Sequence, residues 1–283
     1  MAEGMLRVAL GTTHYRVERP WGEIVPGRAL VSDVVCDSRG HVFVLLRHDS
    51  TLDPDLPAVI ELAPDGRRLA AWGGEAIADG HMLTCGPDDR LYVADRDAHE
   101  IIVFDRNGRR AGGLGARHRP DAPFNHPSGV AVAPSGTVYV ADGYGASRVH
   151  RFAADGTPLG TWGVPGDGPG QFATPHAVHL TDEGRVLVAD RENDRVQCFT
   201  AEGGFLAAWR GFARPMDIFV DAAGNVLVSD QVPRLALLAP NGTLLGRCRP
   251  VLNGAHGIWG DPAGRLYLAE LSPSRLTRLV PID

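Results

Sequence analysis

Three of the eleven histidines recur at one position of an internal repeat, and their spacing is the first sign of chemistry in this sequence. Each lies fourteen residues before an acidic residue that follows a short apolar run: His81 before Asp95, His176 before Asp190 and His256 before Glu270. The repeats in between carry other residues at this position, namely Ser32, Ser128 and Met216. Histidine therefore occupies the position in every second repeat.

If the repeats form a closed ring of six, alternate units lie roughly 120° apart, and side chains at one depth converge on the ring axis. Three imidazoles with an open fourth position are the ligand set of a catalytic zinc ion. Imidazole is a poor ligand for calcium or magnesium, whereas iron, copper and cobalt also bind it. The spacing predicts a zinc centre at His81, His176 and His256. The alternative is that the three share this position by chance and only line a channel.

Cationic and phenolic side chains follow the same apolar runs, where they should reach the same mouth as the histidines. Arg47, Arg96 and Arg191 follow the runs of the first, second and fourth repeats, and Tyr144 lies in the corresponding loop of the third. A guanidinium group binds both oxygens of a carboxylate, so we expect a substrate with a carboxylate. A cation and an arginine can lower a phenol pKa, which would make Tyr144 a base. The alternative is that the arginines pair with acidic groups of the repeats and Tyr144 only packs in its loop.

Short strands separated by turns would position these side chains. The 283 residues include 35 Gly and 21 Pro, and 44% are hydrophobic, which favours an all-β fold with a sizeable core and excludes disorder. The acidic residues Asp95, Asp142, Asp190, Asp230 and Glu270 lie 47, 48, 40 and 40 residues apart. Repeats of roughly 40–50 residues with about four strands are typical of β-propellers. We therefore predict one domain over 1–283, a six-bladed β-propeller, and a purely structural role for Asp95, Asp142, Asp190 and Asp230.

The last repeat has only three strands before the chain reaches Asp283. The segment 13–22, THYRVERPWG, ends in Pro-Trp-Gly, much like the outer strand GTWG at 160–163. We predict that this N-terminal strand supplies the missing strand of the last blade and closes the ring, which removes open sheet edges.

Charge and cysteine usage exclude several classes of protein. The chain has 28 Lys and Arg against 34 Asp and Glu, and its arginines form no basic stripe, so nucleic acid is not an expected partner. No stretch of 18 apolar residues occurs, so we expect no membrane span. The four cysteines form no CxxC pair, and the first residues lack the apolar segment of a secretory signal. We therefore expect reduced thiols and a cytoplasmic protein.

Three segments carry a resemblance to a known family: VADGYGASRVHRF at 140–152, PGQFATPHAVHL at 169–180 and VLVADRENDRVQCF at 186–199. They resemble peptidyl-alpha-hydroxyglycine alpha-amidating lyases (peptidylamidoglycolate lyases), and the repeat form resembles NHL-type six-bladed propellers over about 30–283. The resemblance implies a catalytic zinc on three histidines that match His81, His176 and His256. It implies an active-site tyrosine at Tyr144 and arginines at Arg191 and Arg47.

The activity implied is cleavage of the C–N bond of an α-hydroxyglycine-type carbinolamide, peptidyl or small N-acyl, to an amide and glyoxylate. Zinc would acidify the α-hydroxyl group, Tyr144 would take its proton, and Arg47 would bind the substrate carboxylate. Arg191 would hold the tyrosine or the developing charge, with Arg96 as a further arginine on the same rim. An upstream hydroxylating enzyme is the partner implied.

The sequence departs from the family in several places. The family's structural calcium is held partly by backbone carbonyls that match Val34 and Leu83. Gly257 replaces the family's Asp after the third histidine, which argues against calcium. Gly254-Ala255 replaces a Met-Pro pair whose Met lines the substrate pocket. Two alternatives therefore stay open: a lyase or hydrolase acting on another natural product at the same site, and a non-enzymatic NHL propeller that binds a protein partner.

Disulfides of secreted family members are also missing. Cys198 remains, but the position of its partner is Leu187. The second pair falls on Gly145 and Asn125. These losses agree with the expectation of reduced thiols.

Overall fold

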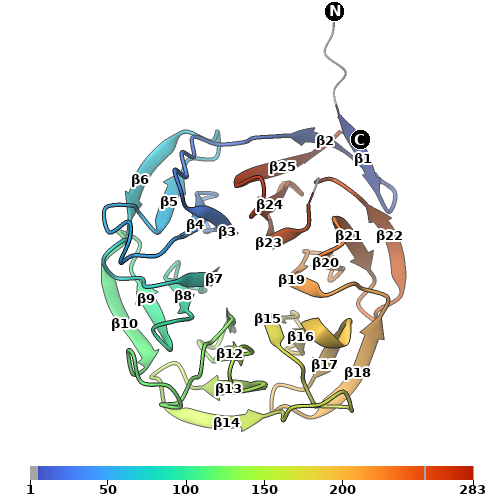
Figure 1. Cartoon of the computed structure of the whole chain (residues 1–283). Helices are drawn as coiled ribbons and strands as arrows, with labels where there is room; N and C mark the ends of the chain where they lie inside the picture. Colours follow the sequence, from blue (N-terminus) through green and yellow to red (C-terminus); the bar gives the residue numbers. More distant parts are fainter. Residues whose placement is uncertain (1–5, 252, 283) are drawn as a thin grey trace, which may run out of the picture.

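The computed structural model describes residues 6–251 and 253–282, which form six antiparallel β-sheets arranged as blades around a central channel (Figure 1). From the channel outward, the first three blades are β3 (Leu30–Cys36), β4 (Val42–Arg47), β5 (Val59–Leu62) and β6 (Arg68–Trp72); β7 (Gly80–Cys85), β8 (Leu91–Asp95), β9 (Glu100–Phe104) and β10 (Arg110–Gly115); and β11 (Gly129–Val132), β12 (Val138–Asp142), β13 (Arg148–Phe152) and β14 (Pro158–Trp162).

The fourth blade contains β15 (Pro175–Leu180), β16 (Val186–Asp190), β17 (Arg195–Phe199) and β18 (Phe205–Arg210), and the fifth contains β19 (Pro215–Val220), β20 (Val226–Asp230), β21 (Arg234–Leu238) and β22 (Leu244–Cys248). The sixth is built on β23 (Ala255–Gly260), β24 (Leu266–Glu270) and β25 (Arg275–Pro281). Within 6–251 and 253–282 the only helix is the three-residue η1 (Arg191–Asn193), so no helix there could cross a membrane. The predicted all-β, six-bladed propeller is confirmed.

The ring closes at the sixth blade as predicted. β2 (Thr13–Glu18) pairs with β25, with Val17 opposite Leu279, so the two ends of the chain share one sheet. β1 (Arg7–Leu10) then pairs with β2 and adds a fifth strand that the sequence analysis did not predict. The expected last residue of the third strand, Asp283, lies outside the described residues.

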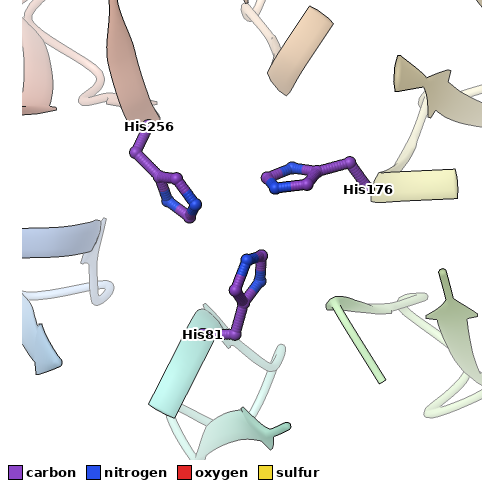
Figure 2. A group of neighbouring side chains, drawn as sticks. All are labelled: His81, His176 and His256. Atoms are coloured by element: carbon purple, nitrogen blue, oxygen red, sulfur yellow. The ribbon is translucent and has the colours of Figure 1, made fainter. Parts of the chain in front are cut away.

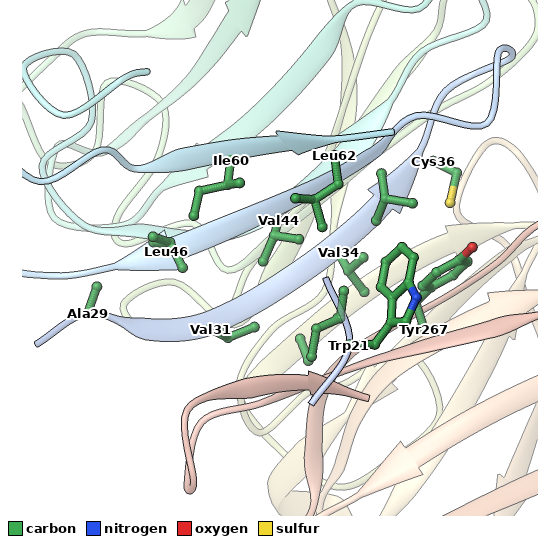
Figure 3. Close-up of a cluster of buried hydrophobic side chains, with 13 residues drawn as sticks. Trp21, Ala29, Val31, Val34, Cys36, Val44, Leu46, Ile60, Leu62 and Tyr267 are labelled. Carbon is green, nitrogen blue, oxygen red and sulfur yellow. The ribbon is translucent and has the colours of Figure 1, made fainter. Parts of the chain in front are cut away.

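Burial follows the position of each strand within its blade. Middle strands such as β16 and β17 are buried along their whole length because neighbouring blades cover both faces, whereas the outer strand β14 is exposed at most positions. The core therefore lies between blades. Figure 3 shows one such cluster between the sixth and first blades, where Trp21 packs on Tyr267 with ring centroids 5.2 Å apart.

The Trp-Gly endings of the outer strands connect neighbouring blades. A Cβ atom at Gly108, where φ is +72°, would lie 2.6 Å from the Trp72 ring of the preceding blade, so both the backbone and the ring require glycine. In the fifth blade a cysteine takes the place of this tryptophan. Cys248 pairs with Leu235 there, as Trp72 pairs with Val59 in the first blade. A cavity of about 660 Å³ lies between the fifth and sixth blades.

The repeated acidic residues hold the loops that precede the innermost strands. Four Asp side chains each accept a hydrogen bond from the backbone N–H group seventeen residues earlier: Asp95 from Ala78, Asp142 from Asn125, Asp190 from Ala173 and Asp230 from Ala213. These bonds lie three residues before the position that carries the histidines. The predicted structural role of these residues is confirmed.

Candidate metal centre

The three histidines occupy the second residue of the innermost strand in alternate blades: His81 in β7, His176 in β15 and His256 in β23. Figure 2 shows their rings directed from three sides at one point of the channel. Ring centroids are 4.7 to 5.0 Å apart, and one ligand atom from each ring lies within 4.8 Å of the others. The structure thus brings together the residues that the repeat spacing singled out.

Hydrogen bonds from the next blade fix the orientation of each imidazole. Nδ1 donates to a backbone carbonyl oxygen: His81 to Ser128 at 2.6 Å, His176 to Met216 at 2.6 Å and His256 to Ser32 at 2.8 Å. A carbonyl only accepts, so Nδ1 carries the proton and Nε2 keeps its lone pair. The three acceptors are the residues that occupy the histidine position in the blades without a histidine.

Burial keeps these imidazoles neutral. It lowers the pKa of His256 to about 4, and burial together with the neighbouring imidazoles lowers the pKa of His81 and His176 well below the usual histidine range. The Nε2 atom of His176 is buried and has no hydrogen-bond partner. Three converging lone pairs with no donor among them suit a divalent ion that prefers nitrogen ligands, so the residues fit zinc.

Tyr144 lies beside this cluster, in the loop after β12. Its hydroxyl group is 3.0 Å from Nε2 of His81, the atom that a metal ion would use. The expectation that arginines lower its phenol pKa is wrong for the protein's own groups. Tyr144 is 39% exposed, yet partial burial raises the pKa of its phenol, and this effect outweighs the opposing charges of Arg191, Arg47 and Arg96.

Two of the predicted arginines, Arg47 and Arg96, share a carboxylate that could not be recognised from the sequence. Asp79 accepts from Nε of Arg47 at 2.6 Å and from Nη2 at 3.1 Å, and it lies 2.6 Å from Nη2 of Arg96. Arg96 also lies over the Tyr144 ring, with Cζ 5.4 Å from its centroid. The Nε and Nη2 atoms of Arg47 therefore already bind Asp79. This differs from the expectation that the whole guanidinium group is available for a substrate carboxylate. The repeat did not single out Asp79, because the same position holds Thr174 and Gly254 in the other two blades that carry a histidine.

Arg191 has fewer partners than the other two arginines. It begins η1 directly after β16, and its Nε atom is buried with no hydrogen-bond partner, 3.6 Å from Glu192 Oε1. Its charge opposes the rise in the pKa of Tyr144 and contributes to the lowered pKa of His176.

Two carboxylates missed by the sequence analysis line a small cavity in the channel, together with Val34 and Leu83. Asp33 accepts from the N–H groups of Val34 at 2.8 Å and Leu83 at 2.9 Å. Asp217 accepts from Ile258 at 2.8 Å. A Cβ atom at Gly257 would lie 1.9 Å from Asp33 Oδ1, so Asp33 fills the space that a side chain at 257 would need. The oxygen donors fit a hard cation such as calcium, although the family's Asp is absent.

Asp217 should make stability depend on pH. Burial raises its pKa to about 7, so the folded state binds more protons than the unfolded chain between about pH 4 and 7, and the unfolding free energy falls as pH rises through that range. We expect Asp217→Asn to remove roughly 3 kcal/mol of the fall between pH 5 and pH 8, because about two pH units of the shift lie in that interval. Urea unfolding at pH 5 and pH 8 in EDTA measures the unfolding free energy of both proteins. The same change with pH in the wild type and in Asp217→Asn would contradict the prediction. Calcium at pH 8 should stabilise only the wild type.

Comparisons with known proteins place the chain among NHL-repeat proteins. The NHL repeat family matches residues 124–152 and 172–199. Human NHL repeat-containing protein 3 is 31% identical over 280 residues, covering 88% of this chain and 79% of that protein. Peptidyl-alpha-hydroxyglycine alpha-amidating lyase 1 of Drosophila melanogaster is 35% identical over 161 residues, covering 52% of this chain and 30% of the lyase.

The rat peptidylglycine alpha-amidating monooxygenase is 29% identical over 223 residues, covering 68% of this chain, and the chain spans only 23% of that enzyme's length. Among solved structures, a gluconolactonase from Xanthomonas campestris superimposes with a TM-score of 0.73 at 16% identity, over 96% of this chain and 91% of that one. Identity this low shows the fold alone. The match to human NHL repeat-containing protein 3 over 88% of this chain, together with the NHL repeat matches, shows that the chain belongs to the NHL-repeat family of β-propellers, with amidating lyases among its homologues.

Proposed function

We propose that the chain is a metal-dependent carbon–nitrogen lyase that converts an α-hydroxyglycine amide, peptidyl or small N-acyl, to an amide and glyoxylate. The observation that carries this proposal is the convergence of three neutral imidazoles, with their Nε2 lone pairs at the channel axis, beside the Tyr144 hydroxyl group. The similarity to the Drosophila amidating lyase supports it.

His81, His176 and His256 would hold the zinc ion. Bound there, zinc supplies Lewis acidity, which lowers the pKa of an alcohol hydroxyl group. The Nδ1 bonds to the backbone keep the rings in the tautomer that a ligand needs.

Tyr144 would move the protons of the reaction. The substrate's α-hydroxyl group loses its proton to the Tyr144 hydroxyl oxygen, and the electrons of that O–H bond form the new carbonyl group of glyoxylate. The C–N bond breaks, and the amide nitrogen takes up one proton, so atoms and charge balance. Partial burial raises the phenol pKa of Tyr144 in the metal-free protein, and a neutral phenol can donate a proton to the departing nitrogen as it receives another.

The arginines would bind the substrate carboxylate. Arg191 has the buried Nε atom without a hydrogen-bond partner, and Arg47 turns only its Nε and Nη2 edge toward Asp79. A substrate of this class must first receive its α-hydroxyl group, so the proposal includes an upstream hydroxylating enzyme as a functional partner.

Glyoxylate release tests the function. Purified protein loaded with one zinc ion per chain should release glyoxylate from α-hydroxyhippurate, a small N-acyl substrate, and a hydroxyglycine-extended peptide tests the peptidyl form. Full metal occupancy without glyoxylate from either compound would refute the lyase. A protein that refuses added zinc would favour a non-enzymatic propeller.

Arg47→Lys should weaken substrate binding more than catalysis. Lysine keeps the charge but loses the fork that binds two carboxylate oxygens, so we expect KM to rise roughly tenfold with little change in kcat. Steady-state kinetics of glyoxylate release measure it, with the exposed Arg67→Lys as the matched control. An unchanged KM would remove Arg47 from the substrate site.

A further inference from the structure

The loop that carries Tyr144 rests on residues 125 and 126 of the same blade. The N–H group of Tyr144 donates to the carbonyl oxygen of His126 at 3.4 Å. Gly145 packs so closely that a Cβ atom there would lie 2.5 Å from the carbonyl oxygen of Asn125. Asp142, at the start of the loop, accepts from the N–H group of Asn125 at 2.8 Å. The position of the Tyr144 ring therefore depends on where this two-residue segment lies.

His99 of the second blade holds that segment from the other side. Its Nδ1 atom accepts a hydrogen bond from the N–H group of His126 at 3.1 Å, and the two rings meet edge to face with centroids 4.3 Å apart. His99 is 8% exposed. Both residues have positive φ angles, +58° for His99 and +61° for His126, which non-glycine residues adopt only when surrounding contacts hold them there.

We infer that His99 is a positioning residue for Tyr144, which it places through the hydrogen bond from the His126 N–H group to its own Nδ1 atom. The inference rests on the proposed function, in which Tyr144 moves the protons. An acceptor at Nδ1 exists only while the imidazole is neutral, because both ring nitrogens of an imidazolium are donors. Protonation of His99 therefore breaks the bond and releases the segment under Tyr144.

The groups around His99 set when this happens. Burial and the neighbouring His126 lower the pKa of His99, with His118 acting in the same direction and the carboxylates of Asp97 and Asp142 opposing. The bond is therefore present at neutral pH and is lost as pH falls below the usual histidine range.

Two substitutions at His99 separate positioning from packing. In His99→Asn the amide oxygen can accept the same hydrogen bond, asparagine tolerates a positive φ, and the side chain does not titrate. In His99→Leu the acceptor is lost and leucine tolerates the positive φ poorly, so wild-type zinc content and protection of β20 are the control for a general folding defect. At pH 7.5 we expect His99→Asn to keep the wild-type kcat, and His99→Leu to lose roughly ten- to a hundredfold in kcat with unchanged zinc content and KM. Between pH 7 and 5, at constant zinc content, kcat should fall less in His99→Asn than in the wild type.

Hydrogen exchange of the metal-free proteins gives a readout that needs no activity. At each pH, the peptide containing residues 143–147 is compared between the wild type and His99→Asn. As pH falls from 7 to 5, this peptide should lose protection in the wild type relative to His99→Asn. In His99→Leu the same peptide should be unprotected at pH 7 and at pH 5. The strand β20 should stay protected in the wild type and in both variants. Equal protection and equal kcat in the wild type and His99→Leu would overturn the inference. If exchange follows the expected pattern but no form releases glyoxylate, the proposed function fails while the positioning contact stands.

Discussion

Replacing His176 with alanine is expected to remove the bound metal ion and to lower kcat roughly a thousandfold, which corresponds to about 4 kcal/mol of transition-state stabilisation. His176 is the histidine whose Nε2 atom is buried with no hydrogen-bond partner, so a ligand at the axis satisfies an atom that otherwise has none. Two imidazoles cannot complete the three-ligand set of a catalytic zinc site. Zinc content after dialysis, together with glyoxylate release, measures the effect.

A matched control shows whether any loss is specific to this centre. His118→Asn changes an exposed histidine on another loop, and asparagine tolerates its positive φ of +58°. The control should keep one zinc ion per chain and wild-type kcat. A His176→Ala protein that does the same would remove the three-histidine centre from the proposed function.

Tyr144→Phe should lower kcat by roughly a hundredfold or more and leave the zinc content unchanged, because it deletes a proton-transfer group while keeping the ring. The Tyr144 hydroxyl group bonds to Nε2 of His81, so its loss should also make that nitrogen easier to metallate. Single-turnover glyoxylate release measures the first effect, and a competitive zinc titration measures the second.

Tyr139→Phe is the control for this substitution. Tyr139 lies in β12, on the same blade, and its hydroxyl group donates to the carbonyl oxygen of Ala201 at 3.2 Å, away from the histidines. It should keep the wild-type kcat. If Tyr144→Phe also kept it, another group would have to move the protons.

The fold and the histidine cluster could be predicted because both repeat. The spacing of fourteen residues between each histidine and its acidic partner encodes a depth in the channel, and alternation between blades encodes convergence on the axis. The ring closure was predictable for the same reason, since Pro-Trp-Gly at 20–22 repeats the ending of the outer strands.

Features without a repeat could not be predicted. The partners of the histidine Nδ1 atoms are backbone carbonyls, which every residue has, so Ser128 and Met216 gave no signal by their type. Asp79 occurs in one blade alone and becomes visible only once the fold brings it to Arg47. The phenol pKa of Tyr144 depends on burial, and a list of neighbouring charges predicts the opposite direction.

The meeting of both chain ends in one blade bears on how such a ring can be combined with other domains. The N–H group of Ile282 donates to the carbonyl oxygen of His14 at 3.0 Å, so the polypeptide enters and leaves the propeller at nearly the same place. A unit of this kind can be inserted into a longer polypeptide without separating the sequences on either side of it. That geometry suits a fold whose match to the rat monooxygenase covers 68% of this chain and only 23% of that enzyme's length.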